Sequence, residues 1–293
     1  MVQEIRVRAH AKINLYLDVV GKREDGYHNL ETIFHSIGLH DDVIIRKQAT
    51  KGITVYCEHP RVPRDSRNLA YRAANLLSDS VGGIDGIAID IHKRIPVAAG
   101  LAGGSANAAA VLHGVNELFG LNFTQETLRQ FGAQLGADVP FCLHGGAALG
   151  LGIGDQLTRL PALSDVPLLL LNPGIEISTA TAFKKLNFSL TIQKKSGIII
   201  ETCLEKGDVM GIGENLYNLL EVPVFCQHPE IAALKTEVST QTGVCGALMS
   251  GSGATVFAVM HNRNAARQSQ LHFKNRVSFC TTTVTSPVGV SVH

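Results

Sequence analysis

Hydrophobic and polar side chains alternate without a break between residues 5 and 19. A period of two is typical of a β-strand that has one face in the core. The odd positions are hydrophobic, whereas the even positions are polar or aromatic. Lys12 and Asn14 are therefore expected side by side on the polar face, about 7 Å apart. The next segment, residues 21–26, has the glycines and charged residues of a turn.

The patterns that follow predict a mixture of strands and helices in the first half of the chain. Runs of β-branched residues indicate strands, and apolar residues three or four positions apart indicate helices. A turn at Asp41–Asp42 is expected to separate two of the strands. Thr124 is expected to cap one helix and Gly136 to end it. The expected strands are residues 31–39, 43–46 and 87–95, and the expected helices are residues 69–77, an alanine-rich stretch ending at residue 119, and residues 125–135.

The second half of the chain continues with the same mixture. The glycine-rich residues 145–154 are interpreted as a seam between two halves, and residues 198–220 are expected to be helical only in part. A second glycine-rich loop is expected at residues 243–253. Strands and helices do not alternate regularly, so an α+β fold is favoured over a doubly wound sheet. The other expected elements are strands at 168–171 and 255–260 and helices at 231–238 and 264–273.

The composition is that of a protein able to bury a sizeable core. The chain has 293 residues, 45% of them hydrophobic, and this length is typical of about two domains. The 26 Lys and Arg residues almost balance the 25 Asp and Glu residues, which argues against a nucleic-acid partner. No apolar run is long enough for a membrane span and the first residues lack a secretory core, so we expect a cytoplasmic protein with no membrane attachment. The six cysteines form no CxxC pair, so we expect reduced thiols and no zinc site.

Three glycines, Gly100, Gly103 and Gly104, lie between an expected strand and an expected helix. Such a loop can point several backbone N–H groups at a phosphate, where the helix N-terminus adds partial positive charge and Ser105 adds a hydroxyl group. The alternative is a tight turn that only lets strand and helix pack closely. The spacing matches neither a Walker A motif nor the dinucleotide-binding G-x-G-x-x-G motif. The later loop at residues 251–253 is expected either to close over a substrate or to serve only as a connection.

Two charged residues are candidates for phosphoryl transfer, which needs charge neutralisation and a group that takes the proton of an alcohol. Asp138 follows the expected helix end and lies just before a proline, which suits a general base held on a restricted turn. Lys12 can keep that carboxylate ionised and stabilise charge on the phosphate oxygens. The alternatives are an aspartate that caps a helix or turn and a lysine exposed on a strand.

Three segments resemble, in order and separation, the motifs of the GHMP kinase superfamily: residues 12–15, residues 96–106 with the helix after them, and residues 249–255. The chain is therefore identified by resemblance as a member of that superfamily. The resemblance implies a two-domain α+β fold. The N-terminal domain, expected at residues 1–158, would be ribosomal protein S5 domain 2-like and bind ATP. The C-terminal domain, expected at residues 159–293, would be ferredoxin-like and bind the substrate.

Four shorter segments resemble one branch of the superfamily, whose members phosphorylate the 2-hydroxyl group of cytidine diphosphate methylerythritol in the non-mevalonate isoprenoid pathway. These segments are residues 11–15, 26–28, 136–140 and 250–253. The resemblance implies ATP and Mg²⁺ as cofactors with no all-protein metal cage, Asp138 as the base and Lys12 as its charged partner. It implies that the ATP phosphates lie on Pro96, Val97, Ala98, Ala99, Gly100, Leu101, Ala102, Gly103, Gly104, Ser105 and Ala106. It implies that the substrate contacts Asn14, Tyr27, His28, Thr179 and Phe183, with Tyr27 and Phe183 on the two faces of the cytosine and His28 at its polar edge.

The sequence departs from the family pattern at three positions. Alanines occupy positions 102 and 106, where other members often have glycine and serine, and Leu219 stands where an aspartate is expected. Three alternative functions remain open: a superfamily kinase for mevalonate, homoserine or a sugar, a non-catalytic nucleotide-binding module, and an RNA-associated module. The balanced charge disfavours the last of these. The sequence leaves the oligomeric state open.

Overall fold

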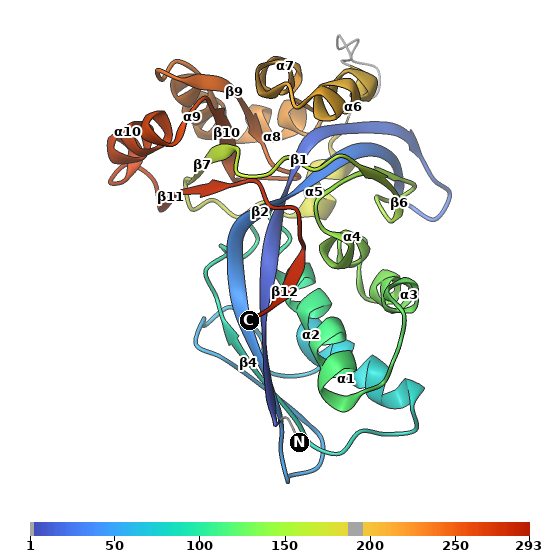
Figure 1. Cartoon of the computed structure of the whole chain (residues 1–293). Coiled ribbons are helices and arrows are strands. Elements are labelled where there is room, and N and C mark those ends of the chain that lie inside the picture. The colour runs from blue at the N-terminus through green and yellow to red at the C-terminus, as the bar shows by residue number, and fades with distance from the viewer. Residues whose placement is uncertain (1–2, 187–195) are drawn as a thin grey trace.

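A computed structural model describes residues 3–186 and 196–293, which form two sheets with helices packed against them (Figure 1). The first sheet has eight strands. Its main path runs β12-β1-β2-β4-β3, with β5 and β8 paired to β2 and β1 and with β6 paired to β5. Its strands are β1 (Glu4–Lys22), β2 (His28–Lys47), β3 (Ile53–Cys57), β4 (Ile87–His92), β5 (Ala147–Leu151), β6 (Gln156–Leu160), β8 (Tyr217–Asn218) and β12 (Val290–Val292).

The two longest strands, β1 and β2, form an antiparallel hairpin that extends from the N-terminal helices to the C-terminal elements (Figure 1). The alternation along residues 5–19 therefore predicted a strand correctly. The expected turn at Asp41–Asp42 is wrong, because β2 continues through both residues. Asp41 is completely buried and its carboxylate is hydrogen-bonded, so the strand can hold it without turning toward solvent.

Helices cover one face of the first sheet. The central one is α2, whose alanine-rich surface packs against β1 and β2 and against the neighbouring helices. Thr124 caps α3 and Gly136 ends it, as predicted. The helix after residue 68 is also confirmed, with Asn68 as its N-cap. These helices are α1 (Leu69–Ser80), α2 (Gly103–Phe119), α3 (Gln125–Leu135) and α4 (Val139–His144).

The second sheet has four antiparallel strands in the order β11-β7-β10-β9. With α9 and α10 between them, these strands follow the β-α-β-β-α-β order of a ferredoxin-like unit, as the resemblance implied. The α+β class is confirmed. The strands are β7 (Pro167–Asn172), β9 (Val244–Met249), β10 (Val256–Met260) and β11 (Phe279–Val284), and the helices of this half are α5 (Thr179–Lys184), α6 (Gly197–Lys206), α7 (Val209–Asn215), α8 (Glu221–Gln227), α9 (Pro229–Ser239) and α10 (Arg263–Phe273).

Two glycine-rich segments differ from their predictions. Residues 145–154 are not a seam, because they contain β5, which pairs with β2 inside the first sheet. Residues 243–253 are not one loop, because β9 occupies their first half. Gly246 in that strand lies so close to the backbone of Gly213 that an added Cβ would be 2.0 Å from the Gly213 carbonyl oxygen. Glycine here permits close packing and does not mark a loop.

The chain crosses between the two sheets more than once. The predicted boundary after residue 158 falls inside β6, and β12 returns from the C-terminal half to pair with β1. The division at residues 1–158 and 159–293 stays a prediction. Among the helices of residues 3–186 and 196–293, none is long and apolar enough to cross a membrane.

Candidate active site

Lys12 lies on β1 with its ammonium group turned into the protein. Only 5% of the residue is exposed. Its Nζ atom donates a hydrogen bond to Asn14 Oδ1 at 2.8 Å and lies 3.9 Å from Asp138 Oδ2. It also lies 5.4 Å from the centre of the Phe34 ring. The polar face of β1 is therefore covered at Lys12 by other parts of the protein. The alternative interpretation, a lysine exposed to solvent on a strand, is wrong.

Asp138 occupies the position just before α4, at the end of the connection from α3. A residue in this place often caps the helix, but within the described part of the chain the Asp138 side chain makes no capping hydrogen bond. About a third of that side chain is exposed. Its carboxylate is thus beside a buried ammonium group and still accessible to a ligand. Residues 126 positions apart in the sequence meet here.

The buried Asn14 orients the ammonium group of Lys12. Its side-chain amide donates to Thr32 Oγ1 at 2.8 Å, and this hydroxyl donates to the carbonyl oxygen of Tyr16 at 2.7 Å. These contacts fix the amide so that its oxygen faces Lys12. Asn14 is 2% exposed, and so its position on the strand is held by the fold before any ligand binds.

The first glycine loop connects β4 to α2 and passes beside Lys12, whose backbone N–H donates to the carbonyl oxygen of Leu101 at 3.2 Å. The first regular N–H bond of the helix runs from Ala106 to the carbonyl oxygen of Ala102. No side chain of the described residues caps this helix at Ala102. The backbone N–H groups at Gly103, Gly104 and Ser105 therefore have no intrahelical partner, which is the arrangement that binds an anion.

Ala102, which stands where other family members often have glycine, has an unusual backbone conformation. Ala102 adopts a left-handed conformation, with φ 56° and ψ 29°, and Ala98 has φ 55°. Glycine populates this region freely, whereas a side chain costs about 1–2 kcal/mol there. The alanine therefore keeps the turn that glycine would make, at some cost in stability. The other departure in the loop, Ala106, is completely buried in the helix.

The second glycine loop lies directly against the first. The hydroxyl of Ser250 donates to the Gly100 carbonyl oxygen at 2.9 Å. A Cβ added to Gly251 would lie 3.4 Å from both Lys12 Nζ and Asn14 Oδ1. Residues 250–253 therefore form one wall of the space around the lysine, and the loop is more than a connection between elements.

Asn218 holds this second loop in place, a role that sequence reasoning missed. Its buried side chain donates to the carbonyl oxygens of Met249 and Gly251 at 2.7 and 2.8 Å. Leu219, the departure from the expected aspartate, is a buried apolar residue in the C-terminal core. Glu221 accepts a hydrogen bond from the Met249 N–H at 2.9 Å. The signal available in the sequence was the isolated asparagine in an apolar run.

The residues expected at the cytosine lie at the far end of the β1–β2 hairpin. The His28 and Phe183 rings are stacked, with centroids 5.3 Å apart and planes at 24°, whereas Tyr27 is 61% exposed. Thr179, at the start of α5, shares a hydrogen bond of 2.9 Å with the hydroxyl of Ser252. Phe183 thus lies on His28, and the expected pairing of Phe183 with Tyr27 about a base stays a prediction. Partial burial lowers the pKa of His28, with Lys22 adding to the effect.

Comparison with known protein families identifies the family of the chain. The profile of the GHMP kinases N terminal domain matches residues 68–146, and the profile of the GHMP kinases C terminal region matches residues 200–276. The chain belongs to the GHMP kinase family. The resemblance seen in the sequence motifs is thereby confirmed.

Proteins of similar sequence to this GHMP kinase share the name of one enzyme. A protein of Acetivibrio thermocellus called 4-diphosphocytidyl-2-C-methyl-D-erythritol kinase is 43% identical over 285 residues, which cover 97% of this chain and all of the relative. A protein of Nostoc punctiforme with the same name is 43% identical over 277 residues, covering 88% of this chain and 87% of the relative.

Solved structures are similar as well. A crystal structure of 4-(cytidine 5'-diphospho)-2C-methyl-D-erythritol kinase superposes with a TM-score of 0.82 at 31% identity, covering 96% of this chain and 100% of that chain. Homoserine kinase from Cytophaga hutchinsonii superposes with a TM-score of 0.77 at 19% identity, covering 100% of this chain and 98% of that chain. The homoserine kinase supports the fold alone.

The site of this GHMP kinase contains few side chains that prefer metals. Among the described residues, no three His, Cys, Asp or Glu side chains come together as a metal cluster. A cavity of about 660 Å³ lies elsewhere, on the outer face of the first sheet, and contains none of the predicted site residues. Its lining includes Arg6, Asp42, Glu58, His59, Lys93 and Arg94. The candidate active site is therefore the junction of Lys12, Asp138 and the two glycine loops.

Proposed function

We propose that the chain is a 4-diphosphocytidyl-2-C-methyl-D-erythritol kinase, which transfers the terminal phosphoryl group of ATP to the 2-hydroxyl of its cytidine diphosphate-linked substrate in isoprenoid precursor synthesis. The observation that carries this proposal is the meeting of Lys12 and Asp138 at the wall formed by the two glycine loops. The relatives named above support the choice of acceptor.

Asp138 is the proposed general base. Its partly exposed carboxylate can accept the proton of the acceptor hydroxyl as the O–P bond forms. Lys12, at 3.9 Å, favours the ionised form of that carboxylate and offers positive charge to the oxygens of the transferred group. Asn14 keeps the ammonium group in place, and the family resemblance supports the proposal that it also contacts the polyol.

Residues 96–106 are the proposed ATP phosphate site. The free N–H groups at the start of α2 and the positive end of the helix favour a polyphosphate. Mg²⁺ bound with the nucleotide would neutralise phosphate charge, and oxygen atoms such as the Ser105 hydroxyl suit this ion. Because the described residues form no cluster of metal ligands, we expect the phosphates to hold most of the coordination.

Tyr27, His28 and Phe183 are the proposed cytosine site, and Thr179 belongs to the substrate loop next to it. An aromatic face is worth about 1–3 kcal/mol to a stacked base. The exposed Tyr27 and the His28–Phe183 stack supply such faces next to the turn between β1 and β2, and the imidazole has both a donor and an acceptor nitrogen. We also propose that the enzyme works in the cytoplasm on small molecules, where its six unpaired cysteines would stay reduced.

The direct test is ADP release with four acceptors supplied separately: 4-diphosphocytidyl-2-C-methyl-D-erythritol, mevalonate, homoserine and galactose. Only the first should support turnover well above the rate without acceptor. Faster turnover with one of the other three would assign the chain to another branch of the family. ATP binding without turnover of any acceptor would indicate a non-catalytic module.

A further inference from the structure

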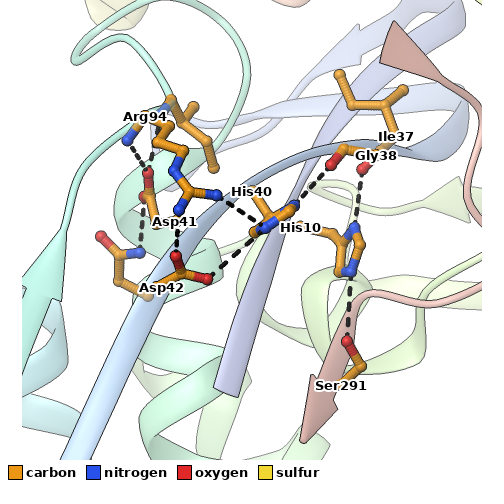
Figure 2. Close-up of polar contacts among 10 residues, drawn as sticks. His10, Ile37, Gly38, His40, Asp41, Asp42, Arg94 and Ser291 are labelled. Carbon is orange, nitrogen blue, oxygen red and sulfur yellow. Dashed lines mark hydrogen bonds and ion pairs between the residues drawn. The ribbon is translucent and has the colours of Figure 1, made fainter. Parts of the chain in front are cut away.

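Asp41 lies in the middle of β2 and is completely buried. Its carboxylate accepts hydrogen bonds from the backbone N–H groups of Arg94 and Ile95 at 2.7 and 2.8 Å (Figure 2). It also accepts one from the side-chain amide of Asn107 at 2.8 Å and forms an ion pair with Lys93. One buried carboxylate thus collects four donors from outside its own strand.

These donors lie on both sides of the first glycine loop. Arg94 and Ile95 are the two residues immediately before Pro96, where the loop begins. Asn107 is on the first turns of α2, directly after the loop. Because Asp41 Oδ1 receives the two backbone N–H groups and Oδ2 receives Asn107, the carboxylate fixes the spacing between the two ends of the loop.

Lys93 is the fourth donor to Asp41, and its ammonium group lies next to the start of α2. Its side chain is 6% exposed, and its ammonium group contacts Asp41 and donates to Asn107 Oδ1 at 3.2 Å. A Cβ added to Gly103 would lie 2.9 Å from this ammonium nitrogen. Lys93 therefore neutralises the buried aspartate within a short distance of the N–H groups that face an anion, so that Asp41 does not repel a phosphate.

The neighbouring Asp42 makes a different set of contacts. It points to the other face of β2, as the alternation of a strand requires, and accepts from Arg94 Nη2 at 2.5 Å (Figure 2). His40 Nε2 accepts from Arg94 Nη1 at 3.1 Å. Asp42 thus holds a side chain, whereas Asp41 holds the backbone just before the loop. The two adjacent aspartates form a matched pair for an experiment.

We infer that Asp41 is a positioning residue for phosphoryl transfer, which holds residues 96–102 in the shape that binds the ATP phosphates. The inference rests on the proposed function, since it needs the first glycine loop to receive the nucleotide. Asp41 touches no substrate itself. It acts through the loop, and so its loss should weaken ATP binding and leave the binding of the acceptor unchanged.

The experiment compares Asp41→Asn with Asp42→Asn in the full chain. An asparagine at position 41 keeps one oxygen that can accept hydrogen bonds. Its NH₂ group, however, would face the N–H donors of Lys93 and Asn107, so the two ends of the loop would have to move. We expect KM for ATP and the directly measured dissociation constant of a non-hydrolysable ATP analogue to rise about tenfold or more. KM for the acceptor should stay within about twofold of wild type. Asp42→Asn should leave both values within about twofold, since it weakens only the partly exposed side-chain contacts of Asp42 with Arg94 and His40.

Equal changes in the two KM values of Asp41→Asn, or a lower melting temperature with unchanged ATP affinity, would overturn the inference. If Asp41→Asn does not fold, Asp41→Glu is tested in the same way. It keeps the charge for Lys93 but displaces the carboxylate by one methylene, and the same selective rise is expected. A wild-type protein that binds no ATP analogue would contradict the proposed function instead, and nucleotide binding without turnover of the acceptor would contradict only the acceptor.

Discussion

The ammonium nitrogen of Lys12 lies 2.8 Å from Asn14 Oδ1 and 3.9 Å from Asp138 Oδ2. The first contact fixes the lysine within β1, while the second brings its charge next to a carboxylate from a different part of the chain. Because Lys12 is almost fully buried and Asp138 is not, a ligand can reach the carboxylate more easily than the lysine. This asymmetry suits a lysine that provides charge and an aspartate that takes a proton.

Replacing Lys12 with methionine should therefore damage turnover more than nucleotide binding. We expect kcat of Lys12→Met to fall about 10²- to 10³-fold, the range seen when a preorganised group facing transition-state charge is removed. Steady-state kinetics and a direct ATP-binding measurement test this. A kcat within about threefold of wild type would show that the ammonium group has no role in the reaction.

Tyr27→Ala should change KM for the cytidine substrate but not KM for ATP. Tyr27 is exposed on the turn between β1 and β2, so its loss should change the free energy of unfolding by less than about 0.5 kcal/mol. Loss of one stacking face should raise KM for the cytidine substrate about tenfold, with KM for ATP unchanged. Tyr56→Ala, at another tyrosine that is about half exposed, is the control. An equal effect on both substrates would argue against a cytosine site at Tyr27.

Gly100→Ala tests the contact between the two glycine loops. Gly100 has φ +75°, and an added Cβ would lie 2.1 Å from the carbonyl oxygen of Ser250. We expect the free energy of unfolding to fall by more than about 1 kcal/mol and KM for ATP to rise. Gly82→Ala is the matched control, because Gly82 has φ +80° and an added Cβ there would meet no described atom within 4 Å. Similar results for both variants would mean that backbone strain alone is responsible and that the loops need no close contact.

The buried His35 should make the protein sensitive to acid. Its Nε2 accepts from the Leu163 N–H at 3.0 Å, which places the proton on Nδ1, where it is donated to the Ser36 carbonyl oxygen at 2.8 Å. Burial lowers the pKa of His35 to about 4, from an ordinary value of 6.5. The unfolded chain therefore binds this proton at a higher pH than the native protein, and stability falls as pH drops from about 6.5 to about 4.

The loss expected from His35 alone is about 3–4 kcal/mol, since the difference spans about 2.5 pH units at about 1.4 kcal/mol each. Chemical denaturation of wild type and His35→Gln at several pH values measures it. The variant should be less stable at pH 7, and the difference should shrink as pH falls. Parallel curves for the two proteins would show that another group causes the acid sensitivity.

Much of the fold could be predicted from local pattern. The alternation of residues 5–19 identifies β1, and helical spacing with Thr124 and Gly136 at the ends identifies α3. These signals are local, because one face of a strand or helix is set by neighbouring residues. Lys12 and Asp138 were also singled out by their local settings, although only the fold brings them to 3.9 Å.

The errors have a common physical cause. Asp41 resembles a turn residue in the sequence, and Gly246 resembles a loop residue, yet both lie within strands. Each is stabilised by partners far away in the chain: the donors around residues 93–107 for Asp41, and the backbone of Gly213 for Gly246. Asn218 was missed for the same reason, because its role depends on carbonyl oxygens of a loop about 30 residues later. Local sequence patterns do not indicate such long-range contacts.

The most direct measurement compares ATP binding and turnover of 4-diphosphocytidyl-2-C-methyl-D-erythritol in wild type and Asp138→Asn, with the exposed Asp85→Asn as a control. Asparagine keeps the size of the side chain but cannot take up the proton of the acceptor. We expect ATP affinity within about threefold of wild type and kcat lower by roughly 10²- to 10⁴-fold, with Asp85→Asn unchanged in both. Near-normal turnover by Asp138→Asn would contradict the assignment of this carboxylate as the base, and with it the central claim about the site.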